Sequence, residues 1–419
     1  MLIEFNVSNY RSIKDSQNFS LSKTSLNELE SKNTFESSGY ELLRTAVIYG
    51  PNASGKSNVM GALSFMKALV LSSAKVDVEE KLEVSPFRLN AKCRNSPSEF
   101  EATFIHQGVR YQYGFCVTQS RVTEEWLLAF PKGRAQKWFE RTYDENTDSY
   151  EWYMGSALQG TKQVWQSSTK SNSLFLSTAV NLNSKQLKPV YDWFRVVLKI
   201  SRTGEGWGPF VSSKLCENDQ KSKVMNFLKA ADMDIEDIDI IEHAFDPANL
   251  PSDMPSVFKE SLIEEFKDQT LLEFKTLKKD DEGVLVDFDL ESEESDGTKK
   301  LFSLAGPWIK ALSEGHVLLI DELHLNLHSK LMEFLIGMFH DPEINVANGQ
   351  LVFTSHDTNI LNKEIFRRDQ VWFCKKDELL ATQLYPLTDF NPHKTRDNFE
   401  ASYLAGKYGA LPFIQRFEE

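Results

Sequence analysis

The sequence predicts an α/β protein built around a parallel sheet. Three short apolar runs of the length of buried strands lie at 45–49, 316–320 and 350–354. Helical periodicity follows the first run, from Asn58 to Leu71, and a helix is expected at 329–339 between the other two. Strands that alternate with helices in this order favour parallel pairing, because each crossover returns the chain to the same edge of the sheet.

The remaining segments predict two lobes of one head and an insertion between them. The first residues alternate like a strand, and 84–154 is rich in aromatic residues and Val separated by turns, which is typical of a set of strands. Residues 170–270 are predicted to be mostly helical, followed by a strand with one buried face at 284–290 and a helix from Thr298 to Leu312. The expected divisions are an N-terminal lobe at 1–165, a mostly helical insertion at 166–271 and a C-terminal lobe at 272–419.

Bulk composition excludes several classes of protein. With 41% hydrophobic and 26% charged residues, the chain of 419 residues has an ordinary globular composition. It contains no apolar run near the ~20 residues that cross a bilayer, and its N-terminus lacks the pattern of a secretory signal. The four cysteines lie far apart without C-x-x-C spacing, which favours reduced thiols. These features predict a cytoplasmic protein with no membrane association.

The net charge of the chain limits which partners it is expected to bind. The net charge of -14 argues against broad, sequence-independent wrapping of nucleic acid, which needs Lys and Arg to neutralise phosphates. A local basic groove is still compatible with this charge, so DNA binding is open but not indicated. Part of the acidic excess is concentrated at 281–296, which holds eight acidic residues and no basic one. Such a run is most often a solvated face.

A phosphate-binding loop is predicted after the first apolar run. It reads Gly50-Pro-Asn52-Ala-Ser-Gly55-Lys56-Ser57, a complete G-x-x-x-x-G-K-S between a predicted strand and a predicted helix. The glycines allow backbone N–H groups at the helix N-terminus to face phosphate oxygens. Lys56 is expected to reach the β- and γ-phosphates of ATP, and the Ser57 hydroxyl to ligate Mg²⁺. A chance glycine turn is the alternative, and the flanking elements argue against it.

Two adjacent carboxylates end the second apolar run. In Val317-Leu-Leu-Ile-Asp321-Glu322, Asp321 would hold Mg²⁺ through water and Glu322 would polarise the attacking water. Adjacent acids at the end of a strand are often merely surface residues. The complete phosphate loop upstream favours the catalytic interpretation.

A histidine follows the third apolar run in Phe353-Thr-Ser-His356. An imidazole at this position can hydrogen-bond a γ-phosphate and so respond to its presence. A single histidine after a strand is more often structural, and it is the order of the motifs that favours a function here. His324 and His328 have the i, i+4 spacing of a metal pair, but the sequence offers no clear third ligand.

The segment Ser295-Asp-Gly297-Thr298 stands at the head of the helix predicted before the acid pair. It resembles the ATP-binding-cassette signature, in which a serine, a glycine and a helix N-terminus clamp the γ-phosphate held by a second molecule. The resemblance implies that Ser295 and Gly297 contact ATP bound to another copy of the chain. An ordinary helix cap is the alternative.

The four motifs, in this order, resemble the cassette ATPase heads of the chromosome-maintenance and Rad-fifty type. More closely, the chain resembles the bacterial anti-phage ATPases related to the overcoming-lysogenisation-defect proteins and to RloA and AriA. This second resemblance covers both ends of the chain well and 120–280 poorly. Besides the phosphate loop, the matching segments are Phe5-x-Val-x-Asn-Tyr-Arg-Ser12, Leu327-His328, Arg367-Arg-Asp-Gln-Val371 and Tyr403-Leu-x-Gly-x-Tyr-Gly-Ala-x-Pro412.

The resemblance implies an ABC-type P-loop ATPase head with ATP and Mg²⁺ as its ligands. Two such heads would close around ATP as a homodimer or part of a larger homo-oligomer, and hydrolysis would release them. It further implies a role in anti-phage defence, in which the ATPase senses infection and controls a toxic nuclease. Only 63 residues follow His356, which is too few for a further domain of ~100 residues, so the nuclease is expected to be a separate polypeptide.

A DNA-repair or DNA-tethering ATPase that acts on DNA directly is the competing interpretation. It would call for a basic groove and usually a coiled-coil arm, and the sequence shows neither clearly. The chain also departs from the anti-phage group, with His324 and Ser329 where that group often has an acid and a proline. Gln107 and Gln112 both remain candidates for the glutamine that senses Mg²⁺ in cassette heads.

Overall fold

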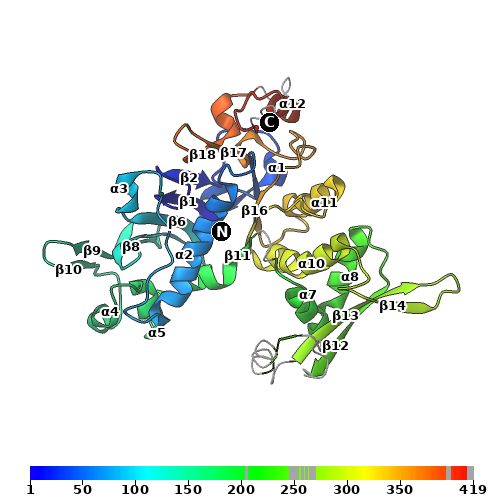
Figure 1. Ribbon diagram of the computed structural model, residues 1–419, viewed down its shortest axis with the longest axis horizontal. Helices are drawn as coiled ribbons and strands as arrows, with labels where there is room; N and C mark the ends of the chain where they lie inside the picture. The colour runs from blue at the N-terminus through cyan, green and yellow to red at the C-terminus, as the bar shows by residue number, and fades with distance from the viewer. Residues whose placement is uncertain are drawn as a thin grey trace. The chain divides into compact units, whose positions relative to one another are not determined.

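A computed structural model describes residues 1–202, 206–244, 254, 255, 259, 263, 270–392 and 398–412 (Figure 1). The chain divides into two compact units. The first, here called the head unit, comprises Met1–Gly206 and Lys310–Glu419, and the second, the inserted unit, comprises Trp207–Ile309. In the described part of the chain, no helix combines the length and the apolar character that crossing a lipid bilayer requires.

The head unit contains a seven-stranded antiparallel sheet in the order β10-β9-β8-β7-β6-β1-β2. The strand at the N-terminus and the strand-rich character of 84–154 are thereby confirmed. Alternate residues of β6, such as Phe100, Ala102 and Phe104, are fully buried, as a sheet with one face in the core requires. The strands are β1 Leu2–Ser8, β2 Gln17–Ser20, β6 Ser98–His106, β7 Val109–Val117, β8 Val122–Phe130, β9 Gln136–Asp144 and β10 Ser149–Met154.

A second, six-stranded sheet has the order β11-β15-β16-β5-β17-β18. The pairs from β11 to β17 are parallel and only β17–β18 is antiparallel, so the predicted parallel core is confirmed. Every residue of β5, β15 and β16 is buried, which explains their continuous apolar sequences. The strands are β5 Thr45–Tyr49, β11 Leu198–Ser201, β15 Val317–Ile320, β16 Gln350–Thr354, β17 Val371–Lys376 and β18 Thr382–Pro386.

Helix α2, Lys56–Ser72, joins the two sheets through one hydrophobic core. Its Val59, Leu63 and Met66 belong to the same buried cluster as Phe100 of the first sheet and Val352 of the second. Helix α11, Ser329–His340, packs against β5 and β16. Both helices fall where the periodicity predicts them. The phosphate loop therefore stands on a strand and a helix that are each fixed by core packing.

Shorter elements complete the head unit. They are the strands β3 Thr34–Ser37 and β4 Tyr40–Leu43, the α-helices α1 Glu30–Asn33, α3 Ala91–Arg94, α4 Lys162–Ser168, α5 Phe175–Asn181, α6 Lys188–Asp192 and α12 Phe399–Leu404, the π-helix Trp193–Val197, and the 3₁₀ helices Ser73–Lys75, Arg368–Gln370 and Leu387–Phe390.

The inserted unit is only partly helical. Helices α7 Phe210–Leu215, α8 Lys221–Ala230 and the start of α10 Asp296–Glu314 accompany an antiparallel sheet of β12 Asp237–Ala244, β13 Thr270–Lys279 and β14 Leu285–Asp289, with a π-helix at Cys216–Gln220. A strand at 284–290 is confirmed, but the expectation that one of its faces is buried is wrong at its start. Val284, Leu285 and Val286 are 57%, 51% and 39% exposed, because this end of the strand forms a projecting hairpin.

The unit boundaries differ from the expected insertion at 166–271. Residues up to Ser201 belong to the head because β11 pairs with β15, and because Trp193 stacks on Phe104 with ring centroids 4.0 Å apart. Conversely, β13 and β14 belong to the inserted unit. Within the expected insertion, 203–205, 264–269 and most of 245–263 lie outside the described residues.

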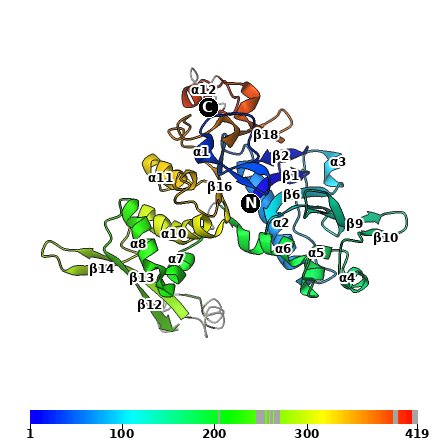
Figure 2. The same ribbon diagram turned by 180° about the vertical axis from the view of Figure 1, so that it is seen from behind.

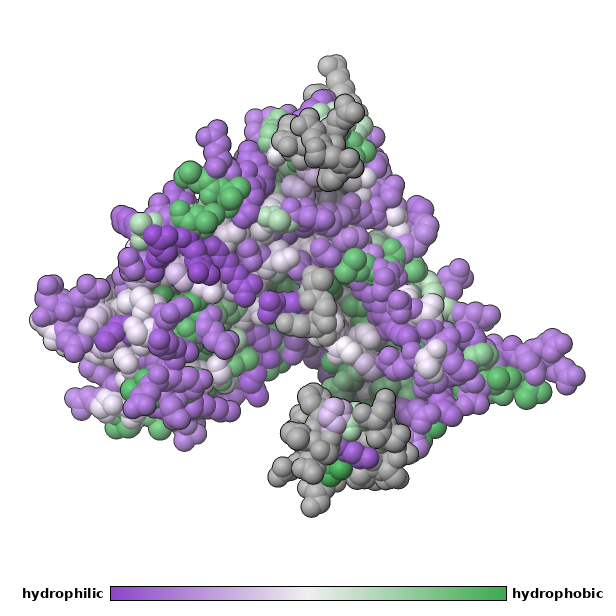
Figure 3. Space-filling model, viewed as in Figure 1, coloured by the Kyte–Doolittle hydropathy of each residue, from purple (hydrophilic) through white to green (hydrophobic). Residues whose placement is uncertain are grey.

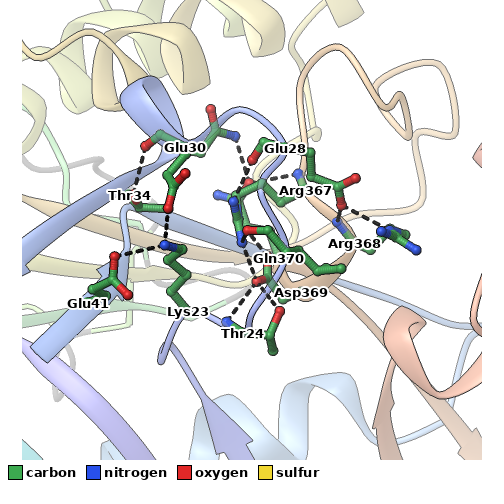
Figure 4. A network of polar contacts seen from close by, with 12 residues as sticks. Lys23, Thr24, Glu28, Glu30, Thr34, Glu41, Arg367, Arg368, Asp369 and Gln370 are labelled. Atoms are coloured by element: carbon green, nitrogen blue, oxygen red, sulfur yellow. Dashed lines mark hydrogen bonds and ion pairs between the residues drawn. The ribbon is translucent and has the colours of Figure 1, made fainter. Parts of the chain in front are cut away.

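A buried ion pair ties the two ends of the chain together (Figure 4). Arg367 is fully buried and forms a two-point contact with Asp369, with Nε–Oδ1 and Nη2–Oδ2 distances of 2.9 and 2.7 Å. Arg367 also donates to the carbonyl oxygens of Leu26 and Glu28, and Asp369 accepts from the backbone and hydroxyl of Thr24. The Arg367-to-Val371 segment therefore fixes the N-terminal residues beside β17.

Removing one member of this pair should destabilise the fold. We expect Asp369→Ala to lower the free energy of unfolding by about 3–5 kcal/mol, because Arg367 would keep its charge in a buried site without a carboxylate partner. Denaturant unfolding followed by tryptophan fluorescence measures this change. The matched control is Glu333→Ala, which removes the exposed Lys330–Glu333 pair and should cost less than about 1 kcal/mol. Equal losses in the two variants would contradict the structural role of the pair.

Candidate functional site

Three adjacent parallel strands end at one edge of the six-stranded sheet, and each carries one of the predicted motifs. Asp321 and Glu322 follow β15, His356 lies two residues after β16, and Gly50 follows β5. The strands pair with Ile320 opposite Phe353 and Thr354 opposite Ile48, so their ends are level. The carboxyl edge of a parallel sheet is where ligands bind in open α/β folds.

Two glycines of the phosphate loop lie where no side chain fits. A Cβ added to Gly50 would lie 2.2 Å from the carbonyl oxygen of Cys374, and one on Gly55 would lie 2.0 Å from Oγ1 of Thr382. Gly55 also has a φ of +109° at the N-cap of α2, which a residue with a side chain rarely adopts. The Thr382 hydroxyl donates to the carbonyl oxygen of Ser54 at 2.9 Å. Close packing against β17 and β18 thus holds the loop in shape.

Lys56 is buried inside the loop that it belongs to. Its Nζ donates to the carbonyl oxygens of Gly50 and Pro51 at 2.8 and 3.1 Å, and lies 3.1 Å from Nε2 of His356. Burial lowers the pKa of Lys56, and the negative charges of Glu322 and Asp321 partly oppose this shift. The buried hydroxyl of Ser54 has no hydrogen-bond partner in the described structure. The loop therefore offers an anion the Lys56 ammonium and the Ser54 hydroxyl.

Thr354 connects the two carboxylate residues. Its hydroxyl donates to Oδ1 of Asp321 at 2.7 Å and accepts from the backbone N–H of Glu322 at 2.7 Å. Asp321 is 7% exposed, and Glu322 has the unusual φ of +55° for a residue with a side chain. The threonine therefore fixes both the carboxylate of Asp321 and the turn that carries Glu322. Sequence reasoning missed the role of Thr354, although its place as the last residue of β16, two residues before His356, could have drawn attention to it.

His356 is neutral in this arrangement. Burial, together with the nearby charges of Lys56 and His324, lowers the pKa of His356 to about 4, against a smaller opposing effect of Asp321. A neutral imidazole that faces the Lys56 ammonium through Nε2 accepts there, so its ring proton is assigned to Nδ1. Nε2 also lies 3.8 Å from Oε1 of Glu322. The histidine thus stands between the lysine of the loop and the second carboxylate.

The donor set fits Mg²⁺ bound together with phosphate groups. Ser57, which is exposed at the start of α2, and Asp321 offer oxygen ligands, which this cation prefers. Among the described residues, no group of three or more His, Cys, Asp and Glu side chains could hold a metal ion. Mg²⁺ at such sites typically takes one or two protein ligands and completes its shell with phosphate oxygens and water.

The other predicted residues have assigned places but different contacts. His328 is the N-cap of α11 and accepts a hydrogen bond from Lys330 N. The ring of His324 is edge-on to the ring of His356, with centroids 5.6 Å apart. Among the described residues, His324 and His328 therefore have no third ligand with which to hold a metal ion. Asn52 is exposed on the loop. Gln107 lies in the β6–β7 turn, and Gln112 donates to Glu101.

The signature segment lies in the inserted unit. The Ser295 hydroxyl accepts from Thr298 N at 3.2 Å, so Ser295 caps the start of α10, as the alternative interpretation holds. The roles of Ser295 and Gly297 toward ATP stay predictions.

A hollow of about 580 Å³ with a mainly apolar lining adjoins the phosphate loop. Ala53 of the loop is part of its wall, together with Arg11, Ser12, Phe87, Lys376 and Leu380. Sequence reasoning used Arg11 and Ser12 only as marks of resemblance. Their position becomes visible only when the N-terminal turn is folded beside β18, where Thr382 N donates to Ser12 O.

Comparison with known proteins agrees with these motifs. Residues 46–362 match the family model described as "AAA domain, putative AbiEii toxin, Type IV TA system". No curated protein matches the chain.

Similar solved structures include two SMC heads and a RecF protein. The SMC head domain from Thermotoga maritima is 12% identical with a TM-score of 0.39, over 92% of this chain and 98% of that one. The recombination mediator protein RecF-ATPrS of the RecFOR pathway is 14% identical with a TM-score of 0.37, over 92% and 98%. The Smc head with an extended coiled coil derived from Pyrococcus furiosus, bound to the C-terminal domain of ScpA, is 10% identical with a TM-score of 0.39, over 97% and 98%.

The family match covers well over half of the chain. It includes the phosphate loop, Asp321, Glu322 and His356, whose side chains the fold brings to one edge of the parallel sheet. The chain therefore belongs to the AAA-domain family of the AbiEii type.

Proposed function

We propose that this protein binds ATP with Mg²⁺ and hydrolyses it at the edge formed by β15, β16 and β5. The observation that supports this most strongly is the contact chain from Lys56 through His356 toward Glu322, beside the hydrogen bond from Thr354 to Asp321. A phosphate loop, two carboxylates and a histidine within one small region are the groups that ATP hydrolysis requires.

Each residue has a role in the proposed reaction. Backbone N–H groups of the loop and the Lys56 ammonium bind the phosphates, while Ser57 and Asp321 hold Mg²⁺. When bound, Mg²⁺ neutralises charge that develops on the phosphate oxygens. Glu322 orients and polarises the attacking water, and His356 contacts the γ-phosphate. Lys56 exchanges its bonds to Gly50 O, Pro51 O and His356 for bonds to phosphate. This frees Nε2 of the histidine to carry the ring proton and donate a hydrogen bond to the γ-phosphate.

The hollow beside the loop is proposed to take the nucleoside part of ATP. Its apolar lining suits the faces of a base, and Arg11 and Lys376 bring positive charge to its wall. The phosphates would then extend over Ala53 into the loop.

The proposed cycle involves two copies of the chain. Ser295 caps α10. The resemblance of the signature segment Ser295–Thr298 to cassette signatures supports a contact with ATP bound by a partner copy. On this basis ATP closes two heads, and hydrolysis opens them. The resemblance to anti-phage ATPases supports a role in which this cycle senses infection and controls a separate toxic nuclease. A direct action on DNA is the second candidate, and the net charge of -14 weighs against it.

Thr354→Val should impair the use of Mg²⁺. The substitution keeps the shape of the side chain but removes the hydroxyl that orients Asp321 and Glu322, so we expect a fall in ATP turnover of about 10–100-fold and a higher Mg²⁺ requirement. Turnover measured against Mg²⁺ concentration tests this, and Thr354→Ser, which restores a hydroxyl, should recover most of the activity. An unchanged Mg²⁺ dependence in Thr354→Val would show that the threonine does not support the metal site.

Glu322→Gln should retain ATP binding and lose hydrolysis. The amide cannot act as a base toward water, so turnover should fall by about 10²–10⁴-fold, and the heads should remain closed with ATP and Mg²⁺. ATP turnover and light-scattering mass are measured together, with Glu333→Gln on α11 as the control. Undiminished turnover in Glu322→Gln would remove this residue from its proposed role.

A mixing experiment tests whether each site is shared between two copies. Lys56→Ala should abolish ATP binding, because the phosphates lose the cation of the loop. Gly297→Trp should retain ATP binding but prevent closure, because a large side chain obstructs the approach of the signature segment to a neighbour. A dimer with one of each variant has one site with an intact loop and an intact signature, so mixing should restore part of the ATPase activity.

Two outcomes would count against the shared site. If mixed dimers form, as shown by affinity tags on the two variants, and stay inactive, then hydrolysis either occurs within one copy or needs both sites. Full activity of Gly297→Trp alone would remove the signature role of this segment.

A further inference from the structure

The hairpin of β13 and β14 has an exposed apolar end. It extends beyond the helices of the inserted unit (Figures 1 and 2), and Val284, Leu285 and Val286 are exposed at its tip. Leu285 pairs with Lys279 and Val286 with Lys278, so successive side chains point to opposite faces of the hairpin. Exposure on both faces means that the described part of the unit covers neither. Figure 3 shows hydrophobic surface there beside hydrophilic side chains.

The outer side of β14 is a free edge in the described sheet, whose order is β12-β13-β14. The backbone of Val284 accepts from Asp280 N, and Leu290 N donates to Phe274 O. Hydrogen-bonded pairs alternate along an antiparallel ladder, so the backbone groups of Leu285, Asp287 and Asp289 face away from β13. Leu285 and Asp287 present N–H and C=O groups to which another strand can bind, whereas both backbone groups of Asp289 are already bonded to Glu293.

The charge around this edge is strongly negative. Residues 270–296 hold ten acidic and three basic residues. The three lysines already have carboxylate partners, because Lys275 pairs with Asp287, Lys278 with Glu294 and Lys279 with Glu236, at 2.8, 2.8 and 2.9 Å. Asp296 lies 3.9 Å from Lys299. The acids still outnumber the basic residues, so the edge keeps a negative charge that a basic partner complements.

This charge decides between the candidate occupants. A second copy pairing edge to edge would bring two acidic hairpins together, and nucleic acid would be repelled for the same reason. Acidic side chains can also serve only to protect an edge from aggregation, but such protection does not account for three consecutive exposed apolar residues at the tip. A basic, extended segment with alternating apolar side chains satisfies the charge, the apolar surface and the backbone groups together.

We propose that the free edge of β14 binds a basic, extended segment of a different protein, which adds to the sheet as a further strand. Backbone hydrogen bonds to Leu285 and Asp287 hold the segment, its apolar side chains pack on the tip, and its Lys or Arg side chains pair with the acidic residues. The inference concerns the inserted unit alone and does not depend on ATP hydrolysis.

The test uses the full chain and labelled eight-residue peptides. The probe alternates Lys and Val, and the comparison peptide alternates Glu and Val. We expect saturable binding of the Lys–Val peptide by fluorescence anisotropy, weakening as salt is added, and no binding of the Glu–Val peptide. Val284→Asn with Leu285→Asn should weaken binding at least about tenfold, because apolar contact is lost. Val346→Asn, at a loop residue that is 68% exposed, is the matched control and should bind like the wild type.

Amide hydrogen exchange supplies a second measurement, because nonspecific hydrophobic binding would not protect alternate amides of β14. Peptide binding should slow exchange at Leu285 and Asp287, whose N–H groups face outward, and leave exchange at Val286 and Phe288 nearly unchanged. Equal binding by the wild type and the double variant, or no saturable binding at low salt, overturns the proposal. Dimerisation of the peptide-free chain that is lost in the double variant also overturns it, since a second copy would then occupy the edge.

Discussion

Parallel hydrogen bonding between β15, β16 and β5 holds the ends of these three strands level, and the arrangement of the site depends on it. The residues of the strands themselves are all buried, and Asp321, Glu322, His356 and the phosphate loop follow the strand ends. The contribution of the strands is positional. A slip of one residue in β16 would move Thr354 away from Asp321 and His356 away from Lys56, since both contacts begin within two residues of the end of that strand.

Thr354 and Thr382 illustrate how ordinary side chains set this geometry. Thr354 satisfies one carboxylate and one backbone N–H at once, which a residue without a hydroxyl cannot do. Thr382 fills the space beside Gly55 and bonds to Ser54 O, so β18 supports the loop from outside. Neither residue is assigned a role by the sequence motifs, yet each determines where motif residues lie.

The sequence predicted the elements whose signals are local. The strand at 350–354 and the helix after Ser57 were predicted because their apolar residues follow a pattern within a short stretch of sequence. Strand β11 was not found, since its four residues carry no alternation and become a strand only by pairing with β15, more than a hundred positions later. The exposure of β14 was missed for a related reason, because alternation predicts a strand but not what lies against it. For the site, the sequence identified the motif residues that the fold brings together, while Thr354 and the hollow at Arg11 depend on contacts between distant segments.

The central place of β5 in its sheet has a consequence for biosynthesis. Both neighbours of β5, β16 and β17, lie about three hundred residues further along the chain. A chain growing on the ribosome therefore carries its phosphate loop long before either supporting strand exists, including the carbonyl of Cys374 in β17 that packs on Gly50. The loop therefore takes its packed shape only after both strands have been synthesised.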